Sequence, residues 1–300
     1  MTANSTLPIN SQLSTAPADG QPLRIAIQGY PGAFHEIAAR EYFQPDRLAI
    51  VPNDSFEDLV RQVTLGEDAD AGLMAIENSL AGSIMENYRL LNTGRVQITG
   101  EIFLRIRQNL LCLPGQTIDD LREVRSHPVA IAQCLEFFRQ YPHIRLVEAV
   151  DTAGSARDIQ ERQLSGVGAI ASSLAAELYG LEVLAPGIET NKQNYTRFWA
   201  IHRQSTSSPQ KSAEKVSLCF SVEHEVGSLQ KVLSVFSAYQ LNLTKIQSAP
   251  IIGRKWEYLF YLDFVLGDRF AWPQAVDAIR PLVHHLQVLG AYPKGRCVEY

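Results

Sequence analysis

The stretch NKQNYTRFWAI, residues 191–201, decides the fold of this chain. Its last four residues, FWAI, are apolar and rich in aromatic and β-branched side chains, which predicts a buried strand. The strand follows an α/β unit that has already closed, so we expect it to return to an earlier sheet. Two lobes with a cleft between them would result. Asn194, Thr196 and Arg197 stand directly before the apolar run. They are either the polar loop that begins many strands or one wall of that cleft.

The chain before this strand alternates short apolar strands with amphipathic helices. Residues 23–94 have the order βαβαβα, which predicts a mostly parallel sheet with helices on both faces. Two extended segments, VQITGEIFL and QNLLCLPG, come next. A second, smaller α/β unit then has helices expected at 117–124, 128–141, 152–164 and 172–179. We therefore predict an α/β body over 23–203, with lobes of about 23–100 plus 190–203 and of 101–189.

The segments outside this body differ from it in composition. Residues 1–22 lack Lys and Arg and have no apolar stretch, so they are predicted to be a disordered tail and not a signal peptide. Residues 204–213 are rich in Ser, Thr, Pro and Gln and read as a linker. Residues 214–300 have the order βαββαβ, which predicts a separate ferredoxin-like domain.

Composition excludes several classes of function. Hydrophobic residues make up 46% of the chain and charged residues 20%, which is typical of a globular protein. A net charge of −5 without a basic cluster argues against nucleic acid as a partner. No apolar run approaches the length that spans a bilayer. Cys112, Cys134, Cys219 and Cys297 are far apart in apolar contexts, so buried free thiols and a cytoplasmic location are expected.

The common cofactor motifs are missing from the sequence. GYPGAF follows a strand and precedes a helix, but it lacks the Gly-x-Gly-x-x-Gly spacing, and no Gly-Lys-Ser/Thr phosphate loop occurs. The seven histidines form no metal-binding pattern. We therefore expect no metal and no cofactor.

Hydroxyl and amide side chains recur where strands give way to helices. Each alone could be a helix N-cap, but in open α/β sheets these junctions border the ligand crevice, and helix N-termini there bind anions. Together they favour a cleft for an anionic small molecule. The candidate residues are Asn78, Ser79, Ser83, Ser126, Thr152, Ser155, Ser172 and Asn194.

Several of these segments resemble one known family, the prephenate dehydratases. The segments are GYPGAFHEIAA, AIENSLAGSI, SHPVAIAQC, DTAGSA and QNYTRFWAI. The C-terminal segments GSLQKVLSVF and KIQSAPIIGRKWEYLFYLDF resemble the ACT regulatory domain that follows the catalytic part in that family. The resemblance covers residues 23–293 and implies a two-lobed body like that of periplasmic binding proteins.

The resemblance also implies a reaction, in which prephenate loses CO₂ and water to give phenylpyruvate in phenylalanine biosynthesis. Thr196 matches the threonine tied to catalysis in the family. The junction residues above and Phe198 would contact the substrate. Arg197 would be either an anchor for the substrate's carboxylate or a structural ion-pair partner. His35 stands where relatives often have Ser or Thr, and it receives no role.

In the C-terminal domain the resemblance implies a site for the effector L-phenylalanine, and association into a homodimer or homotetramer. The residues at the family's two effector motifs are Gly227, Ser228 and Leu229, then Gln247 and Ser248. Many relatives carry Glu-Ser-Arg-Pro where this chain has Gln-Ser-Ala-Pro. Two charges are therefore missing, which leaves the strength and identity of the effector open.

Two alternative functions stay open at this point. The same fold could act on arogenate, which carries an ammonium group that prephenate lacks, and assays of both substrates would separate them. A non-enzymatic amino-acid or keto-acid sensor could share the two-lobed architecture, although the Thr-Arg-Phe motif speaks against it. A transcription regulator would need a DNA-binding helix pair or a basic face, and neither is recognisable.

Overall fold

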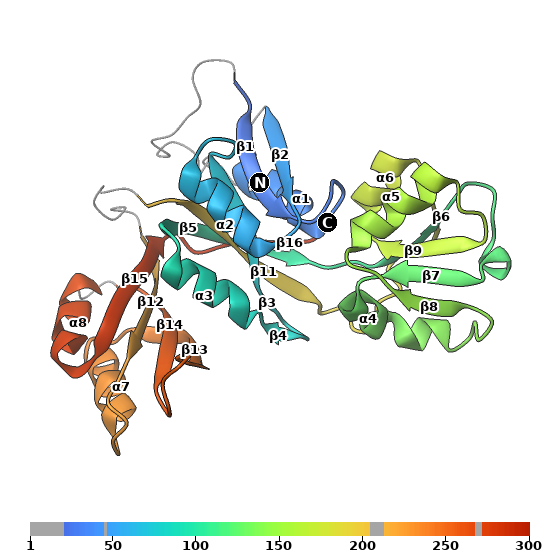
Figure 1. The fold of residues 1–300 in the computed structure, drawn as a ribbon. Helices are drawn as coiled ribbons and strands as arrows, with labels where there is room; N and C mark the ends of the chain where they lie inside the picture. Colours follow the sequence, from blue (N-terminus) through green and yellow to red (C-terminus); the bar gives the residue numbers. More distant parts are fainter. Residues whose placement is uncertain (1–20, 45–46, 205–212, 268–271) are drawn as a thin grey trace, which may run out of the picture.

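Three bodies make up the computed structural model, which describes residues 21–44, 47–204, 213–267 and 272–300. Figure 1 shows the first lobe in the centre, the second lobe at the right and the C-terminal domain at the lower left. Nearly all of the predicted tail and linker lie outside the described residues. No described helix is long and apolar enough to cross a membrane.

The first lobe is built on a sheet whose strand order is β16-β5-β11-β3-β1-β2, with β4 paired to β3. Its strands are β1 Leu23–Gln28, β2 Leu48–Asn53, β3 Ala71–Asn78, β4 Gly82–Ser83, β5 Val96–Arg105, β11 Tyr195–Arg203 and β16 Cys297–Val298. Its helices are α1 Phe34–Phe43, α2 Phe56–Leu65 and α3 Met85–Thr93. β11 lies between β3 and β5, antiparallel to both, so the late strand does return to the first sheet.

Alternation along β11 divides its side chains between two cores. Phe198 and Ala200 pack with α1 on one face of the sheet. Trp199 and Ile201 pack with α2 and α3 on the other. All four are buried, as expected for a central strand that is covered on both faces.

The second lobe has a sheet of order β10-β6-β9-β7-β8. Its strands are β6 Asn109–Cys112, β7 Glu123–Ser126, β8 Arg145–Glu148, β9 Val167–Ala171 and β10 Glu182–Ala185. Its helices are η1 Ile118–Asp120, α4 Pro128–Phe138, α5 Thr152–Arg162 and α6 Ser173–Tyr179.

The predicted helix 117–124 is wrong. A single 3₁₀ turn begins at a capping box on Thr117 and ends at Asp120, and β7 begins at Glu123. β7 pairs with both β8 and β9, so its ladder hydrogen bonds override a local sequence that favours helix.

The C-terminal domain has the βαββαβ order, with a sheet of order β13-β14-β12-β15. Its elements are β12 Lys215–Ser221, α7 Ser228–Ala238, β13 Asn242–Pro250, β14 Tyr258–Val265, α8 Trp272–Ile279, η2 Arg280–Leu282 and β15 His284–Tyr292. The helices cover one face of this sheet. The other face packs on α3 and the first lobe, where Tyr261, Leu289 and Tyr292 join the core that contains Trp199.

The chain returns to the first lobe after the C-terminal domain, a feature that the sequence did not predict. β16 pairs in parallel with β5 at the edge of the first-lobe sheet. Arg296 and Glu299 hold it there through contacts to Glu41 and to Arg105 and Tyr195. Cys112, Cys134 and Cys219 are buried free thiols, but Cys297 is exposed, contrary to expectation, because it lies at this edge.

Candidate active site

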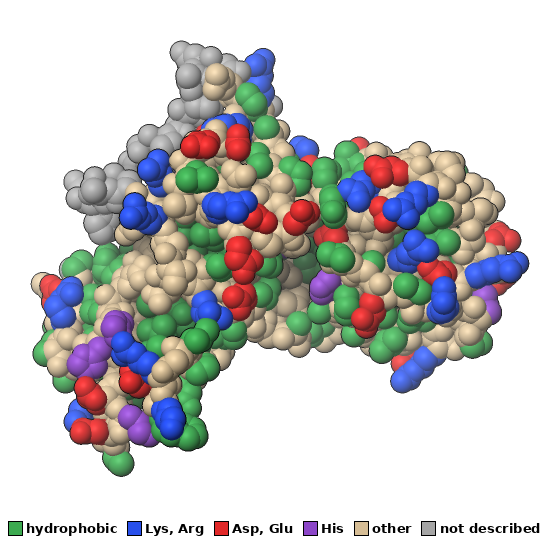
Figure 2. All heavy atoms as spheres, viewed as in Figure 1, with side chains coloured by type: hydrophobic (Ala, Val, Ile, Leu, Met, Phe, Trp, Pro, Cys, Tyr) green, Lys and Arg blue, Asp and Glu red, His purple; other side chains and the backbone are tan. Residues whose placement is uncertain are grey.

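A cleft of about 510 Å³ lies between the two lobes. Figure 2 shows the surface hollowed at this place, between the central lobe and the lobe at the right. Residues from both lobes line it. The polar ones are Gln28, His35, Asp54, Ser55, Glu57, Asn78, Ser83, Gln108, His127, Gln133, Asp151, Thr152 and Thr196. Of the residues proposed from sequence, it therefore brings together Asn78, Ser83, Thr152, Thr196 and Phe198.

Asn78 and Thr196 lie on the first-lobe side of the cleft, at paired positions in β3 and β11. The Asn78 Oδ1 atom accepts the backbone N–H groups of Leu80 and Ala81, at 3.0 and 2.9 Å, which fixes the orientation of the amide. Its Nδ2 atom then donates to Thr196 Oγ1 at 3.1 Å. Because this is the one side-chain bond of the Thr196 hydroxyl among the described residues, its own hydrogen atom remains free to donate into the cleft.

A chain of amides extends from this pair into the second lobe. Asn78 Nδ2 also donates to Asn194 Oδ1 at 2.8 Å, and Asn194 Nδ2 donates to Gln133 Oε1 at 2.9 Å. Gln133, from α4, lines the cleft. Since its oxygen is occupied, its Nε2 group keeps hydrogen atoms to donate to a ligand. Asn194 is fully buried behind the wall and orients both neighbours.

Three helix N-termini meet at the cleft. Ser55 caps α2, His127 caps α4 and Asp151 caps α5, and all three residues line the cavity. The free backbone N–H groups and dipoles of helix starts favour bound anions. No Lys or Arg belongs to the lining in the described part of the chain. Anionic groups in this cleft would therefore be held by amides, hydroxyls and helix N-termini.

An aromatic wall completes the first-lobe side of the cleft. The rings of His35 and Phe198 pack edge to face with centroids 5.1 Å apart. Burial lowers the pKa of His35 to about 4, and its Nε2 atom accepts the backbone N–H of Ala75 at 3.4 Å. At neutral pH His35 is thus an uncharged, largely apolar surface.

Four of the proposed hydroxyl residues lie outside the cleft and stabilise the fold around it. Ser126, buried, donates from Oγ to the Ile170 carbonyl at 2.7 Å and so joins β7 to β9. Ser155 donates to the carbonyl of Asp151 at 2.8 Å. Ser172 caps α6 and donates to the carbonyl of Gly32 at 2.5 Å, across the two lobes. Ser79 exchanges hydrogen bonds with the backbone of Gln193 and Tyr195.

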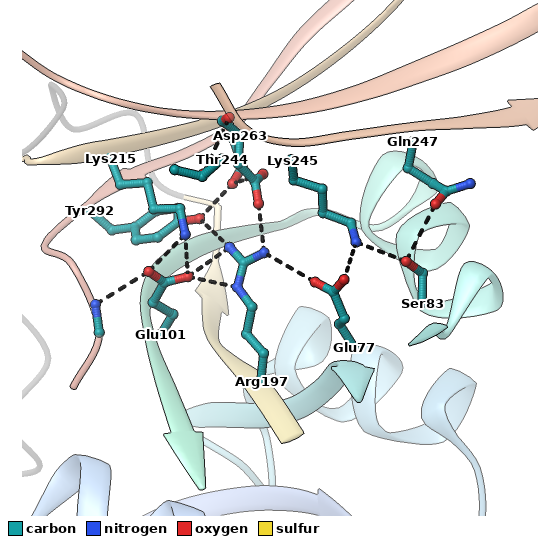
Figure 3. Close-up of polar contacts among 12 residues, drawn as sticks. Glu77, Ser83, Glu101, Arg197, Lys215, Thr244, Lys245, Gln247, Asp263 and Tyr292 are labelled. Atoms are coloured by element: carbon teal, nitrogen blue, oxygen red, sulfur yellow. Dashed lines mark hydrogen bonds and ion pairs between the residues drawn. The ribbon is translucent and has the colours of Figure 1, made fainter. Parts of the chain in front are cut away.

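Arg197 is also absent from the cleft lining, so the structure favours the ion-pair alternative for it. The residue follows Thr196 in β11 and points to the opposite face of the sheet, toward the C-terminal domain (Figure 3). Its guanidinium lies 2.6 Å from Glu101 Oε2 and 2.6 Å from Asp263 Oδ2. Only 6% of the side chain is exposed. Lys215 shares Glu101, and Ser217 donates to Asp263.

Three glutamines of the lining, Gln28, Gln108 and Gln133, were missed from sequence. Gln133 follows Val129 by four residues and Ala130 by three, so this spacing could have identified one face of the helix. Gln108 is 3% exposed, and its Oε1 atom has no hydrogen-bond partner among the described residues. It belongs to the connection between β5 and β6, where sequence pattern alone gives no indication of direction.

The C-terminal domain has a hollow of about 350 Å³ at the start of α7. Ser228, Leu229, Trp256 and Tyr258 line it, together with Glu223 and Glu225. Gly227 caps α7 with φ +83°, a conformation that favours glycine. Gln247 does not line this hollow, because it lies in a strand position facing the first lobe, beside Ser83.

Comparison with known proteins places these features in a family. A sequence profile described as prephenate dehydratase matches residues 25–206. The chain is 39% identical over 299 residues to "Arogenate dehydratase/prephenate dehydratase 6, chloroplastic" of Arabidopsis thaliana, covering 94% of this chain and 72% of that protein. It is 38% identical to "Arogenate dehydratase 2" of Petunia hybrida, covering 95% of this chain and 75% of that protein.

Solved structures share the fold over most of the chain. The prephenate dehydratase of Arthrobacter aurescens in complex with L-Phe has a TM-score of 0.80 at 26% identity, and 90% of this chain and 89% of that chain are covered. A structure described as GqqA, a novel type of quorum quenching acylase, has a TM-score of 0.82 at 32% identity and covers 90% of this chain and 98% of that one.

Proposed function

This chain belongs to the prephenate dehydratase family of decarboxylating lyases, and we propose that its substrate is prephenate, converted to phenylpyruvate, CO₂ and water. The observation that carries the proposal is the Asn78–Thr196 pair at the wall of the interlobe cleft. Aromatisation of the ring drives this reaction, so the residues need only hold the substrate and help the hydroxyl group leave.

Thr196 is the proposed donor to the leaving oxygen. Asn78 occupies a lone pair of the Thr196 hydroxyl, which directs the hydroxyl hydrogen away from Asn78. A threonine hydroxyl is a weak acid, so it acts as a hydrogen-bond donor that stabilises the departing oxygen. One preorganised donor of this kind contributes about 3 to 4 kcal/mol to the transition state.

The absence of Lys and Arg from the described lining suits the decarboxylation. The ring carboxylate turns from an anion into neutral CO₂, so a strong cationic grip would stabilise the ground state more than the transition state. The Nε2 group of Gln133 would donate to the pyruvyl carboxylate, and the dipole at the start of α4 would favour this anion. The aromatic wall of His35 and Phe198 would accept the ring.

Arogenate is the second candidate, and a specific observation favours it. Asp54, Glu57 and Asp151 line the cleft, and any of them could pair with the ammonium group that distinguishes arogenate. Burial raises the pKa of Asp151, while backbone hydrogen bonds from Gly154 and Ala153 oppose that rise. A bound ammonium group would favour the ionised carboxylate.

The experiment that tests the function compares both substrates on the purified full-length chain. kcat/KM is measured with prephenate, by the formation of phenylpyruvate, and with arogenate, by the formation of phenylalanine. The proposal expects the larger kcat/KM for prephenate. A larger value for arogenate transfers the function to the second candidate, and no turnover of either substrate refutes both.

Regulation by L-phenylalanine is proposed for the hollow at the start of α7. The N-terminus of α7 can hold an amino acid's carboxylate, and Glu223 or Glu225 its ammonium group. Trp256 and Tyr258 would contact the aromatic ring. Pairing of two copies of this domain into a homo-oligomer is part of the same proposal. Calorimetric titration with L-phenylalanine, together with an inhibition assay, tests it. The absence of both heat and inhibition at millimolar concentration would contradict the proposal.

A further inference from the structure

Strand β13 of the C-terminal domain contacts the cleft-lining residue Ser83 through two side chains, Lys245 and Gln247. Lys245 Nζ lies 2.7 Å from Glu77 Oε1 and donates to Ser83 Oγ at 2.8 Å. Ser83 in turn contacts Gln247, two residues further along β13, at 3.4 Å. Figure 3 shows Lys245 and Gln247 descending from β13 toward Glu77 and Ser83. The ammonium group therefore bridges two residues of the first lobe.

The two residues bridged by Lys245 belong to the part of the first lobe that forms the cleft wall. Glu77 in β3 pairs directly with Ser83 in β4. Ser83 lines the cleft. Glu77 precedes Asn78, whose amide orients Thr196. A shift of Glu77 and Ser83 would thus move Asn78, which orients Thr196, the proposed donor to the leaving oxygen.

Burial makes this contact sensitive to the loss of a charge. The Lys245 side chain is 9% exposed, and its Nζ atom lies 5.7 Å from the centre of the Tyr88 ring. The nearest other cation to Glu77 is Arg197, at 3.9 Å, which is already engaged by Glu101 and Asp263. Without Lys245, Glu77 would lack a close counter-ion in a half-buried place, and its side chain would relocate toward water.

We propose that Lys245 is a positioning residue for the active site, supplied by the C-terminal domain. It holds the β3–β4 turn, residues 77–83, in the conformation that lets Asn78 orient Thr196. This proposal rests on the proposed function, because it assigns Lys245 a part in the same reaction. It also means that the C-terminal domain contributes to catalysis when no effector is bound.

The test is a double-mutant cycle on the full-length chain without effector. Lys245→Met removes the charge and the donor but keeps a long apolar side chain, and it is expected to lower kcat by about tenfold or more. KM should change less than kcat, because Lys245 touches no substrate. Ser83→Ala should lower kcat too, and the double variant should be little worse than Lys245→Met alone. Lys245→Arg should recover part of kcat. Lys231→Met, on the exposed face of α7, is the matched control.

Each outcome decides the proposal. A folded Lys245→Met enzyme with wild-type kcat, or strictly additive effects of the two substitutions, overturns it and leaves the proposed function intact. If the wild-type enzyme turns over neither prephenate nor arogenate, the proposed function itself is refuted. If Lys245→Met does not fold, the neutral pair Glu77→Gln with Lys245→Met leaves no unpaired charge at this contact. Wild-type kcat in that pair overturns the proposal, and a loss that matches Ser83→Ala supports it.

Discussion

Thr196 and Arg197 are neighbours in β11, yet their side chains point to opposite faces of the sheet. Thr196 lines the interlobe cleft, whereas Arg197 is buried among acidic residues beneath the C-terminal domain. The alternation of a β-strand produces this separation. The two residues therefore make opposite predictions for substitution.

Thr196→Ala is expected to reduce turnover. Loss of the donor should lower kcat by about a hundredfold or more with a smaller change in KM, because the hydrogen bond strengthens only as the hydroxyl leaves. Steady-state kinetics measure this, with Thr196→Ser as the variant that keeps the hydroxyl. Near-wild-type turnover by folded Thr196→Ala would remove Thr196 from the mechanism.

Arg197→Met is expected to act on stability. Glu101 and Asp263 would each lose a close charged partner in a buried site, which should lower the free energy of unfolding by about 3 to 5 kcal/mol. Chemical denaturation measures the change. Arg61→Met is the control, since Arg61 is 64% exposed and its ion pair with Asp58 should contribute about 1 kcal/mol or less. A large rise in KM with unchanged stability would instead restore Arg197 as a substrate anchor.

Gln133→Met should weaken substrate binding and turnover together. The substitution removes a donor to the substrate and the acceptor that holds Asn194. We expect kcat/KM to fall by about ten- to a hundredfold, the range for a hydrogen bond to a charged group. Gln140→Met, exposed just beyond the end of the same helix, controls for effects on the lobe. Equal kcat/KM in the two variants would exclude Gln133 from the site.

His35 predicts a pH dependence of stability. Its pKa is lowered to about 4 in the folded chain by burial, so between its usual value of about 6.5 and about 4 the unfolded chain binds one more proton. Stability should fall as the pH drops through this window, by up to about 1.4 kcal/mol per pH unit for this group. Above the window His35 contributes no slope.

Denaturation between pH 4 and 8 measures this slope. His202, whose pKa burial also lowers to about 4, contributes a similar term that stays in all variants. His35→Gln should reduce the slope of the free energy of unfolding against pH, because the one proton that His35 binds on unfolding is lost. His143→Gln, with an exposed side chain, should leave it unchanged. An unaltered curve in His35→Gln would show that His35 titrates alike in both states.

Much of the fold could be predicted because the strong signals in the sequence are local. The apolar runs, such as residues 198–201, and the amphipathic helices each depend on residues within a few positions of one another. β7 and β16 could not be predicted in the same way. Both are short, and their stability comes from partners such as β9 and β5 that are distant in sequence.

The site was predictable in part, for a similar reason. The position of Thr196 follows from its motif and from the end of a strand. The direction of a junction hydroxyl depends on how its strand packs in the lobe, which the local sequence does not encode. Ser83 lines the cleft, whereas Ser126 is buried and donates to the Ile170 carbonyl. Gln133 lies in mid-helix; residue spacing indicates which side chains share its face of α4, but the packing of α4 decides that this face turns to the cleft.

The return of β16 to the first lobe gives the C-terminal domain two covalent attachments to the same body. The chain leaves the first lobe at Arg203 and re-enters its sheet at Cys297. A domain attached at one point can swivel in every direction, whereas one attached at two points turns mainly about the line that joins them. A rotation of this domain would therefore run mainly about the line that joins these two attachments. Lys245, on a strand away from both attachments, lies where such a rotation would displace it against Glu77.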